Sequence, residues 1–150
     1  MDSATIQRLF LETPHNRALG FSIVEVGTGE GVAKLPYGDH LIGNPDMGLV
    51  HGGVITTLMD VTCALSIFST LDAFQPMATL DLRIDYLKPA LPRKDIYGYA
   101  HCYKRTRNVA FARGVAYHED RDDPIANAVA TFIMSPGITS PGITSPGAPQ

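Results

Sequence analysis

The first part of the chain has short hydrophobic patterns that change period. Between residues 3 and 12, hydrophobic residues recur at helical spacing, which predicts a short amphipathic helix that Pro14 discourages from continuing. Two strand-like runs follow, at residues 21–26 and 31–35. Because residues 27–30 between them contain two glycines suited to a tight turn, the pattern predicts a β-hairpin.

A long apolar segment occupies the centre of the chain. Residues 52–71, GGVITTLMDVTCALSIFSTL, are apolar on most faces and predict a buried helix. Residues 37–48 before it contain three glycines and a proline and have no sustained period, so they predict a loop. The apolar segment is long enough to cross a bilayer, but Asp60 at its middle would cost about 2.5–3.5 kcal/mol there. We therefore expect a core helix and no membrane association.

After this helix the hydrophobic period changes to two. Within residues 79–87, Leu80 and Leu82 share one face of a strand and Thr79 lies on the other. Three further strand-length runs follow, separated by polar, turn-like segments: 96–103, 109–118 and 125–134. Because no helix separates these four strands, the order predicts an α+β fold with an antiparallel sheet.

The predicted elements indicate one domain that needs extra cover for its helix. A helix that is apolar on most sides requires either a sheet that curls around it or a second subunit, so we expect at least a dimer. The length predicts a single domain at residues 1–135, of which 1–16 are an N-terminal helix and linker. Residues 136–150, with their SPGIT repeat, predict a flexible tail.

Composition and charge exclude several partners. Lys and Arg number 12 against 15 Asp and Glu, and no basic stripe is present, so nucleic acid is not expected as a partner. The N-terminus lacks a secretory pattern, and Cys63 and Cys102 have no zinc-like spacing, which predicts a cytoplasmic protein with reduced thiols. Asp39, His40 and Asp46 are irregularly spaced, so no metal is expected.

The central segment also carries the candidate chemistry. Asp60 is its only charged residue, and a buried carboxylate is costly unless it is paired or used. Where the loop becomes helix stand His51, Gly52 and Gly53, whose unpaired amide N–H groups can stabilise a developing negative oxygen and which a substrate can approach closely. Asp60 lies roughly 13 Å further along the helix. Antiparallel pairing of two such helices would bring Asp60 of one chain near Gly52 of the other.

These residues resemble a known family. The segments NPDMGLVHGGVITTLMDVTCA, residues 44–64, and TLDLRIDYLKPA, residues 79–90, resemble the hotdog-fold acyl-CoA thioesterases of the phenylacetate-pathway (PaaI-like) type. The resemblance implies a hotdog fold, an antiparallel sheet wrapped around a long central helix. It also implies homodimers with shared active sites and hydrolysis of aryl- or medium-chain acyl-CoA, with no cofactor beyond the coenzyme A of the substrate. Pairing of dimers into tetramers is left open.

The resemblance also implies roles for individual residues. Asp60 corresponds to the general base or nucleophile and Gly52 to the N–H donor for the oxyanion, while His51 would orient the loop or the thioester. Thr79 stands where relatives carry a hydroxyl residue that helps place water, although the strand pattern puts it on the opposite face from the neighbouring leucines. Asn44 lies one residue further from the histidine than the asparagine of relatives.

Other positions have two interpretations. Gly53 is expected to contact the substrate, and Lys104, Arg105 and Arg107 either bind the phosphates of coenzyme A or form an ordinary solvated turn. His51 either takes a direct role or bonds to backbone where the helix begins. For the whole protein, the alternative is a non-catalytic acyl-CoA-binding hotdog protein. A hotdog hydratase needs an Asp followed closely by a His in its helix-entry motif, and no such Asp stands directly before His51 here.

Overall fold

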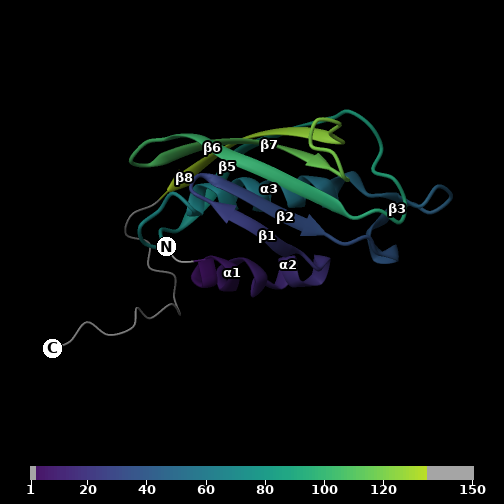
Figure 1. Cartoon of the computed structure of the whole chain (residues 1–150), viewed down its shortest axis with the longest axis horizontal. Coiled ribbons are helices and arrows are strands. Elements are labelled where there is room, and N and C mark those ends of the chain that lie inside the picture. Colours follow the sequence, from purple (N-terminus) through teal and green to yellow (C-terminus); the bar gives the residue numbers. More distant parts are fainter. Residues whose placement is uncertain (1–2, 135–150) are drawn as a thin grey trace.

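The structure, a computed structural model, describes residues 3–134, and Figure 1 shows how their elements are arranged. In chain order the elements are α1 (Ser3–Leu11), α2 (Pro14–Leu19), β1 (Ser22–Gly27), β2 (Glu30–Leu35), the 3₁₀ helix η1 (Asp39–Leu41), β3 (Ile42–Asn44), β4 (Leu49–Val50), α3 (Gly52–Phe68), β5 (Met77–Tyr86), β6 (Ile96–Arg105), β7 (Val109–Tyr117) and β8 (Ala126–Met134). The predicted tail, residues 136–150, lies outside the described residues.

Six strands form one antiparallel sheet in the order β1-β2-β6-β7-β8-β5. β1 and β2 make the predicted hairpin, and Gly29 in its turn has a φ of 77°, which glycine adopts without strain. β5 does not pair with β6, the next strand along the chain, but with β8, so it forms one edge of the sheet. The sheet curves around α3 (Figure 1). The predicted α+β class, an antiparallel sheet around a long central helix, is confirmed.

Helix α3 lies directly on the inner face of the sheet. Two glycines allow this close approach: a Cβ atom on Gly31 of β2 would lie 2.8 Å from Leu65 Cγ, and one on Gly98 of β6 would lie 2.6 Å from Thr62 Oγ1. The side chains of α3 are buried mainly in its second half, in contact with β2, β6 and β7. The helix ends at Phe68, slightly before the predicted end.

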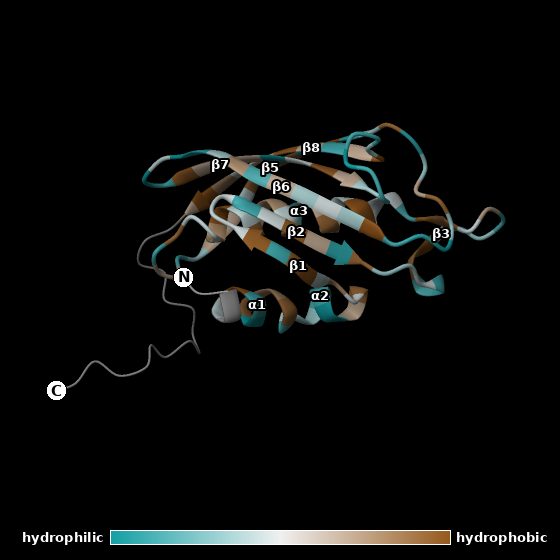
Figure 2. Ribbon diagram, in the orientation of Figure 1, coloured by the Kyte–Doolittle hydropathy of each residue, from teal (hydrophilic) through white to brown (hydrophobic). Residues whose placement is uncertain are grey.

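The N-terminal segment contains more structure than the sequence pattern predicts. Pro14 ends α1 as expected but also begins α2, because proline suits the first turn of a helix, and the predicted linker is therefore helical. The buried Asn16 donates from Nδ2 to the Phe10 carbonyl oxygen at 2.8 Å and ties the two helices together. Both helices carry hydrophobic and hydrophilic residues (Figure 2), and Ile6 and Phe10 of α1 join the core around the second half of α3.

The segment predicted as a loop, residues 37–48, holds η1 and the first strand of a two-stranded β3–β4 pair. Its last residues form the turn that leads to β4. The backbone N–H of His51 then donates to the Leu41 carbonyl oxygen at 2.8 Å, which fixes this small hairpin against the start of α3.

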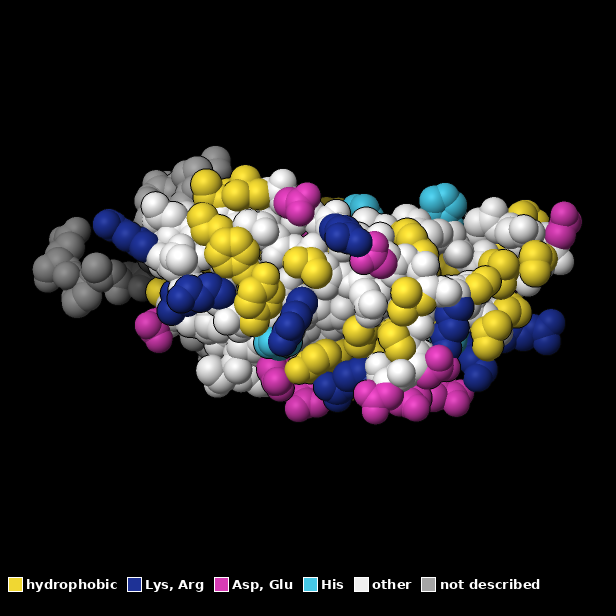
Figure 3. All heavy atoms as spheres, turned by 90° about the horizontal axis from the view of Figure 1, so that it is seen from above, with side chains coloured by type: hydrophobic (Ala, Val, Ile, Leu, Met, Phe, Trp, Pro, Cys, Tyr) yellow, Lys and Arg dark blue, Asp and Glu magenta, His cyan; other side chains and the backbone are white. Residues whose placement is uncertain are grey.

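The outer face of the sheet, seen from above in Figure 3, carries hydrophobic side chains among basic and acidic ones. On β8, for example, Val129 and Ile133 are exposed, whereas Ala128, Ala130 and Phe132 point to the core. Within residues 3–134, no helix is long and apolar enough to cross a membrane.

Candidate active site

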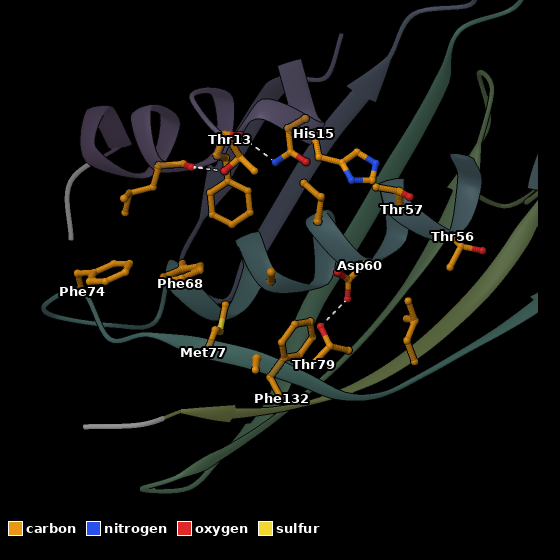
Figure 4. A pocket seen from close by; sticks show the side chains of 17 residues that line it. Thr13, His15, Thr56, Thr57, Asp60, Phe68, Phe74, Met77, Thr79 and Phe132 are labelled. Carbon is orange, nitrogen blue, oxygen red and sulfur yellow. Dashed lines mark hydrogen bonds between the residues drawn. The ribbon is translucent and has the colours of Figure 1, made fainter. Parts of the chain in front are cut away.

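Asp60 lies on the wall of a pocket with a volume of about 660 Å³. The pocket is bounded by the N-terminal helices, by α3 and by β5, and Figure 4 shows Asp60 near its middle. Its side chain is partly exposed, so the expectation of a carboxylate enclosed in the core is wrong. The cause is the position of the two N-terminal helices, because α1 and α2 line a cavity beside Asp60 instead of filling this face of α3 with packed side chains.

Thr79 on β5 is hydrogen-bonded to this carboxylate. Its Oγ1 donates to Asp60 Oδ1 at 2.8 Å, and Figure 4 shows the two side chains pointing toward one another. The simple alternation of β5 predicted that Thr79 faces away from Leu82. The structure instead has a β-bulge between Thr79 and Asp81, with Leu80 as the extra residue, so that Thr79 and Leu82 both line the pocket. Leu80, predicted to share a face with Leu82, is 59% exposed.

The start of α3 presents one available amide. His51 is the N-cap residue, and its Nδ1 accepts a hydrogen bond from the Gly53 N–H at 2.9 Å. This is the backbone-bonded role that was one of two interpretations for His51, and it occupies the Gly53 donor. The Gly52 N–H has no hydrogen-bond acceptor among residues 3–134, so it remains available to a ligand.

Tyr86, the last residue of β5, ties the start of α3 to this strand. Its hydroxyl donates to the Gly52 carbonyl oxygen at 2.7 Å and lies 2.7 Å from Thr56 Oγ1. Together with His51, it fixes the Gly52–Gly53 peptide at both its oxygen and its nitrogen. No sequence pattern singled out Tyr86, because the contact joins residues 34 positions apart. The only available signal is its place inside the TLDLRIDYLKPA segment.

Within one chain, Asp60 and the Gly52 N–H do not meet. Both belong to helix α3, and their eight-residue separation corresponds to about 12 Å of helical rise. Asn44 is also remote from the pocket: it is exposed in the β3–β4 turn, where its Oδ1 accepts from the Met47 N–H at 3.2 Å.

The basic cluster lies at one end of the sheet and does not line the pocket. Lys104, Arg105 and Arg107 are exposed at the β6–β7 turn. The backbone carbonyl oxygen of the neighbouring Asn108 accepts from the Met134 N–H at 2.7 Å, and Met134 pairs with Met77 at the start of β5. Their predicted role with phosphates stays a prediction.

Cys63, one turn after Asp60 on α3, is excluded as a nucleophile. Burial, with a smaller contribution from the Asp60 carboxylate, raises the pKa of its thiol to about 12. The thiol therefore stays neutral near pH 7, whereas the thiolate is the reactive form. Within the described part of the chain, no three His, Cys, Asp or Glu side chains gather as a metal site would require.

The chain is similar in sequence and in fold to known thioesterases. A profile of the thioesterase superfamily matches residues 47–125, more than half of the chain. The medium/long-chain acyl-CoA thioesterase YigI of Salmonella typhimurium is 29% identical over 136 residues, covering 81% of this chain and 85% of YigI.

Two solved structures illustrate the similarity of fold. A Pseudomonas aeruginosa protein of known crystal structure has 45% identity and a TM-score of 0.79, covering 87% of this chain and 96% of that one. The Escherichia coli PaaI protein from the phenylacetic acid degradation operon has a TM-score of 0.78 at 16% identity, covering 89% and 94% of the two chains, which shows a shared fold.

The wrapped sheet and the pocket beside α3 define a protein of the hotdog fold. The chain belongs to the thioesterase superfamily. This confirms the resemblance of its sequence to hotdog thioesterases of the PaaI-like type.

Proposed function

We propose that this protein hydrolyses acyl-CoA thioesters and that Asp60 is its catalytic carboxylate. The observation that carries the proposal is the position of Asp60, which is held by Thr79 on the wall of a largely apolar pocket large enough for an acyl group. The name of YigI, a medium/long-chain acyl-CoA thioesterase, supports medium-chain acyl-CoA as the substrate, and aryl-CoA esters fit the same apolar pocket.

The geometry supports two routes for Asp60. As a general base, the carboxylate takes a proton from water while the water oxygen attacks the thioester carbonyl, the C–S bond then breaks, and the departing thiolate receives the proton. As a nucleophile, the carboxylate attacks the carbonyl itself, and the C–S bond breaks so that coenzyme A leaves as its thiolate. Water then hydrolyses the resulting anhydride, which frees the acid and the Asp60 carboxylate, and a proton from that water goes to the thiolate. In both routes the Thr79 hydroxyl fixes Oδ1, and Oδ2, which has no hydrogen-bond partner among residues 3–134, is the oxygen that acts.

The Gly52 N–H is the proposed donor to the oxyanion, supplied by a second copy of the chain. A backbone amide aimed at a developing negative oxygen is a strong source of catalysis. Because the 12 Å or so of helix between Gly52 and Asp60 prevents both from touching one carbonyl, we place Gly52 of the partner beside Asp60. The edge position of β5, next to the pocket, supports a homodimer formed along this strand.

The decisive experiment compares wild type with Asp60→Asn on a panel of acyl- and aroyl-CoA esters, following release of the free thiol. We expect kcat/KM to fall at least about 100-fold, the range for loss of an acid–base group. Asp72→Asn, at an exposed position beyond α3, is the matched control and should keep full activity. Equal rates in wild type and Asp60→Asn would refute the assigned role. Tight binding of acyl-CoA without turnover by wild type would instead favour the non-catalytic alternative.

A further inference from the structure

The pocket around Asp60 has two chemically different ends. In Figure 4 the side chains of His15, Thr56 and Thr57 lie toward one end, while Phe68 and Phe74 lie toward the other. Asp60 and Thr79 stand between the two groups. A thioester whose carbonyl lies at Asp60 therefore has a polar direction and an apolar direction available to its two arms.

The apolar end is closed by a row of three aromatic rings. Phe10 meets Phe68 edge to face, with centroids 5.4 Å apart, and Phe68 stacks on Phe74 at 5.8 Å. The three rings come from α1, from the last residue of α3 and from the connection to β5. Because aromatic pairs in these geometries attract one another beyond simple burial, the row is a defined wall.

Between Asp60 and this wall, α3 presents a small residue. Ala64 lies four positions after Asp60 and four before Phe68, so the three residues follow one face of the helix and all line the pocket. The distance along the helix from Asp60 to Phe68 is about 12 Å. The methyl group of Ala64 leaves this path open, and a larger side chain there would project across it.

Part of the pocket lining comes from residues outside the segment that the superfamily profile matches. Leu9, Phe10 and Asn16 of α1 and α2 line the pocket, whereas the superfamily profile matches residues 47–125. The residues that limit the pocket at its apolar end are thus partly contributed by the N-terminal helices of this chain.

We propose that these helices set the acyl-chain length that the enzyme accepts. The acyl group lies along α3 from Asp60 past Ala64 and ends against the Phe10–Phe68–Phe74 wall, while the pantetheine arm leaves past Thr57. The substrate class that fits is a straight, apolar acyl chain of medium length. This inference rests on the proposed function for the identity of the CoA ester, but the pocket that it describes is testable by binding alone.

The first test is the rate profile over a series from acetyl-CoA to palmitoyl-CoA. In Ala64→Leu, the ratio of octanoyl-CoA turnover to turnover of the shortest ester that wild type hydrolyses should fall at least about tenfold. This is the loss expected when roughly two buried methylene groups are displaced. In Phe10→Leu the preferred length should move to longer chains. Ala18→Leu, on the exposed side of α2, is the control and should leave the profile unchanged.

A second measurement separates this inference from the proposed function. Calorimetric titration of octanoyl-CoA and of free coenzyme A into Asp60→Asn, with and without Ala64→Leu, reports pocket occupancy without catalysis. Weaker octanoyl-CoA binding with unchanged coenzyme A binding supports the pocket. If Asp60→Asn proves active, the same titration is made with the thioether octyl-CoA, which cannot be hydrolysed, so the test does not depend on the proposed function. Equal octanoyl-CoA affinities, or an unchanged length profile in folded Ala64→Leu and Phe10→Leu, would overturn the inference. If Ala64→Leu does not fold, Phe10→Leu alone decides, since the wall proposal requires its shift to longer chains.

Discussion

At the scale of single residues, the hydrogen bonds around Gly52 select one amide from two neighbours. The motif His51-Gly52-Gly53 offers two glycine N–H groups, and sequence alone does not rank them. In the structure the Gly53 N–H is taken by His51 Nδ1, whereas the Gly52 N–H has no acceptor within residues 3–134. In the proposed mechanism His51 therefore acts indirectly, by leaving the Gly52 N–H as the single donor to the oxyanion.

This selection is testable with a substitution that removes only the donor. Gly52 is the first residue of α3, where proline is well tolerated, and His51 at φ −63° and ψ 132° already has the conformation required before proline. Gly52→Pro should lower kcat about 10²–10³-fold, as removal of an oxyanion donor does. Gly52→Ala is the matched control. Its Cβ atom, like that of proline, would lie 3.3 Å from the Tyr86 hydroxyl, but its N–H remains. Steady-state rates that are equal for the two variants would remove Gly52 from the mechanism.

At the scale of elements, β5 shows what periodicity predicts and where it fails. Alternation correctly locates a strand after the central helix, and the same signal finds β6, β7 and β8. The bulge at Leu80 is invisible to that signal, because an extra residue is accommodated by pairing with β8, a strand about fifty residues further along the chain. The prediction that Thr79 faces away from Leu82 failed for this reason. The role in placing water that the family resemblance implies for Thr79 stays a prediction.

The same limit applies to the rest of the site. Asp60 was identifiable as one charge in an apolar run, and His51 and Gly52 by their position at the start of a helix. Tyr86 and the aromatic wall of the pocket were not, because each acquires its role through contacts between segments distant in sequence. Likewise α2 was missed, since Pro14 signals the end of one helix and the beginning of another equally well.

The junction of β5 with α3 through Tyr86 should contribute to stability. Tyr86→Phe removes the hydroxyl that donates to the Gly52 carbonyl oxygen, and we expect the free energy of unfolding to fall by about 1 kcal/mol. Urea unfolding at a fixed protein concentration measures this change. Tyr103→Phe is the control, because Tyr103 is similarly exposed and its hydroxyl makes no hydrogen bond within the described residues. An equal loss of stability in both variants would show that the Tyr86 hydrogen bond contributes nothing specific.

At the scale of the whole molecule, one chain carries the two halves of the proposed machinery at separate places. The carboxylate faces the pocket from the middle of α3, and the free amide lies at its first residue. The pocket opens beside β5, which is an edge strand of ten residues. An edge of this length presents unpaired backbone groups that a second copy can bind by adding its own strand. Two-fold pairing would then make two equivalent sites, each with Asp60 from one chain and Gly52 from the other.

Mixed dimers distinguish this arrangement from a site contained in one chain. Asp60→Asn and Gly52→Pro chains, carrying different tags, are co-expressed and the mixed dimer is isolated by two affinity steps. If the sites are shared, one site of the mixed dimer contains both substitutions and the other contains neither, so activity should return to about half of wild type although both parent dimers are inactive. A mixed dimer of two differently tagged Asp60→Asn chains is the control and should stay inactive. If the Asp60→Asn and Gly52→Pro mixed dimer is as inactive as its parents, Asp60 and Gly52 do not act across the subunit boundary, and the separation of about 12 Å along α3 then excludes Gly52 as the oxyanion donor.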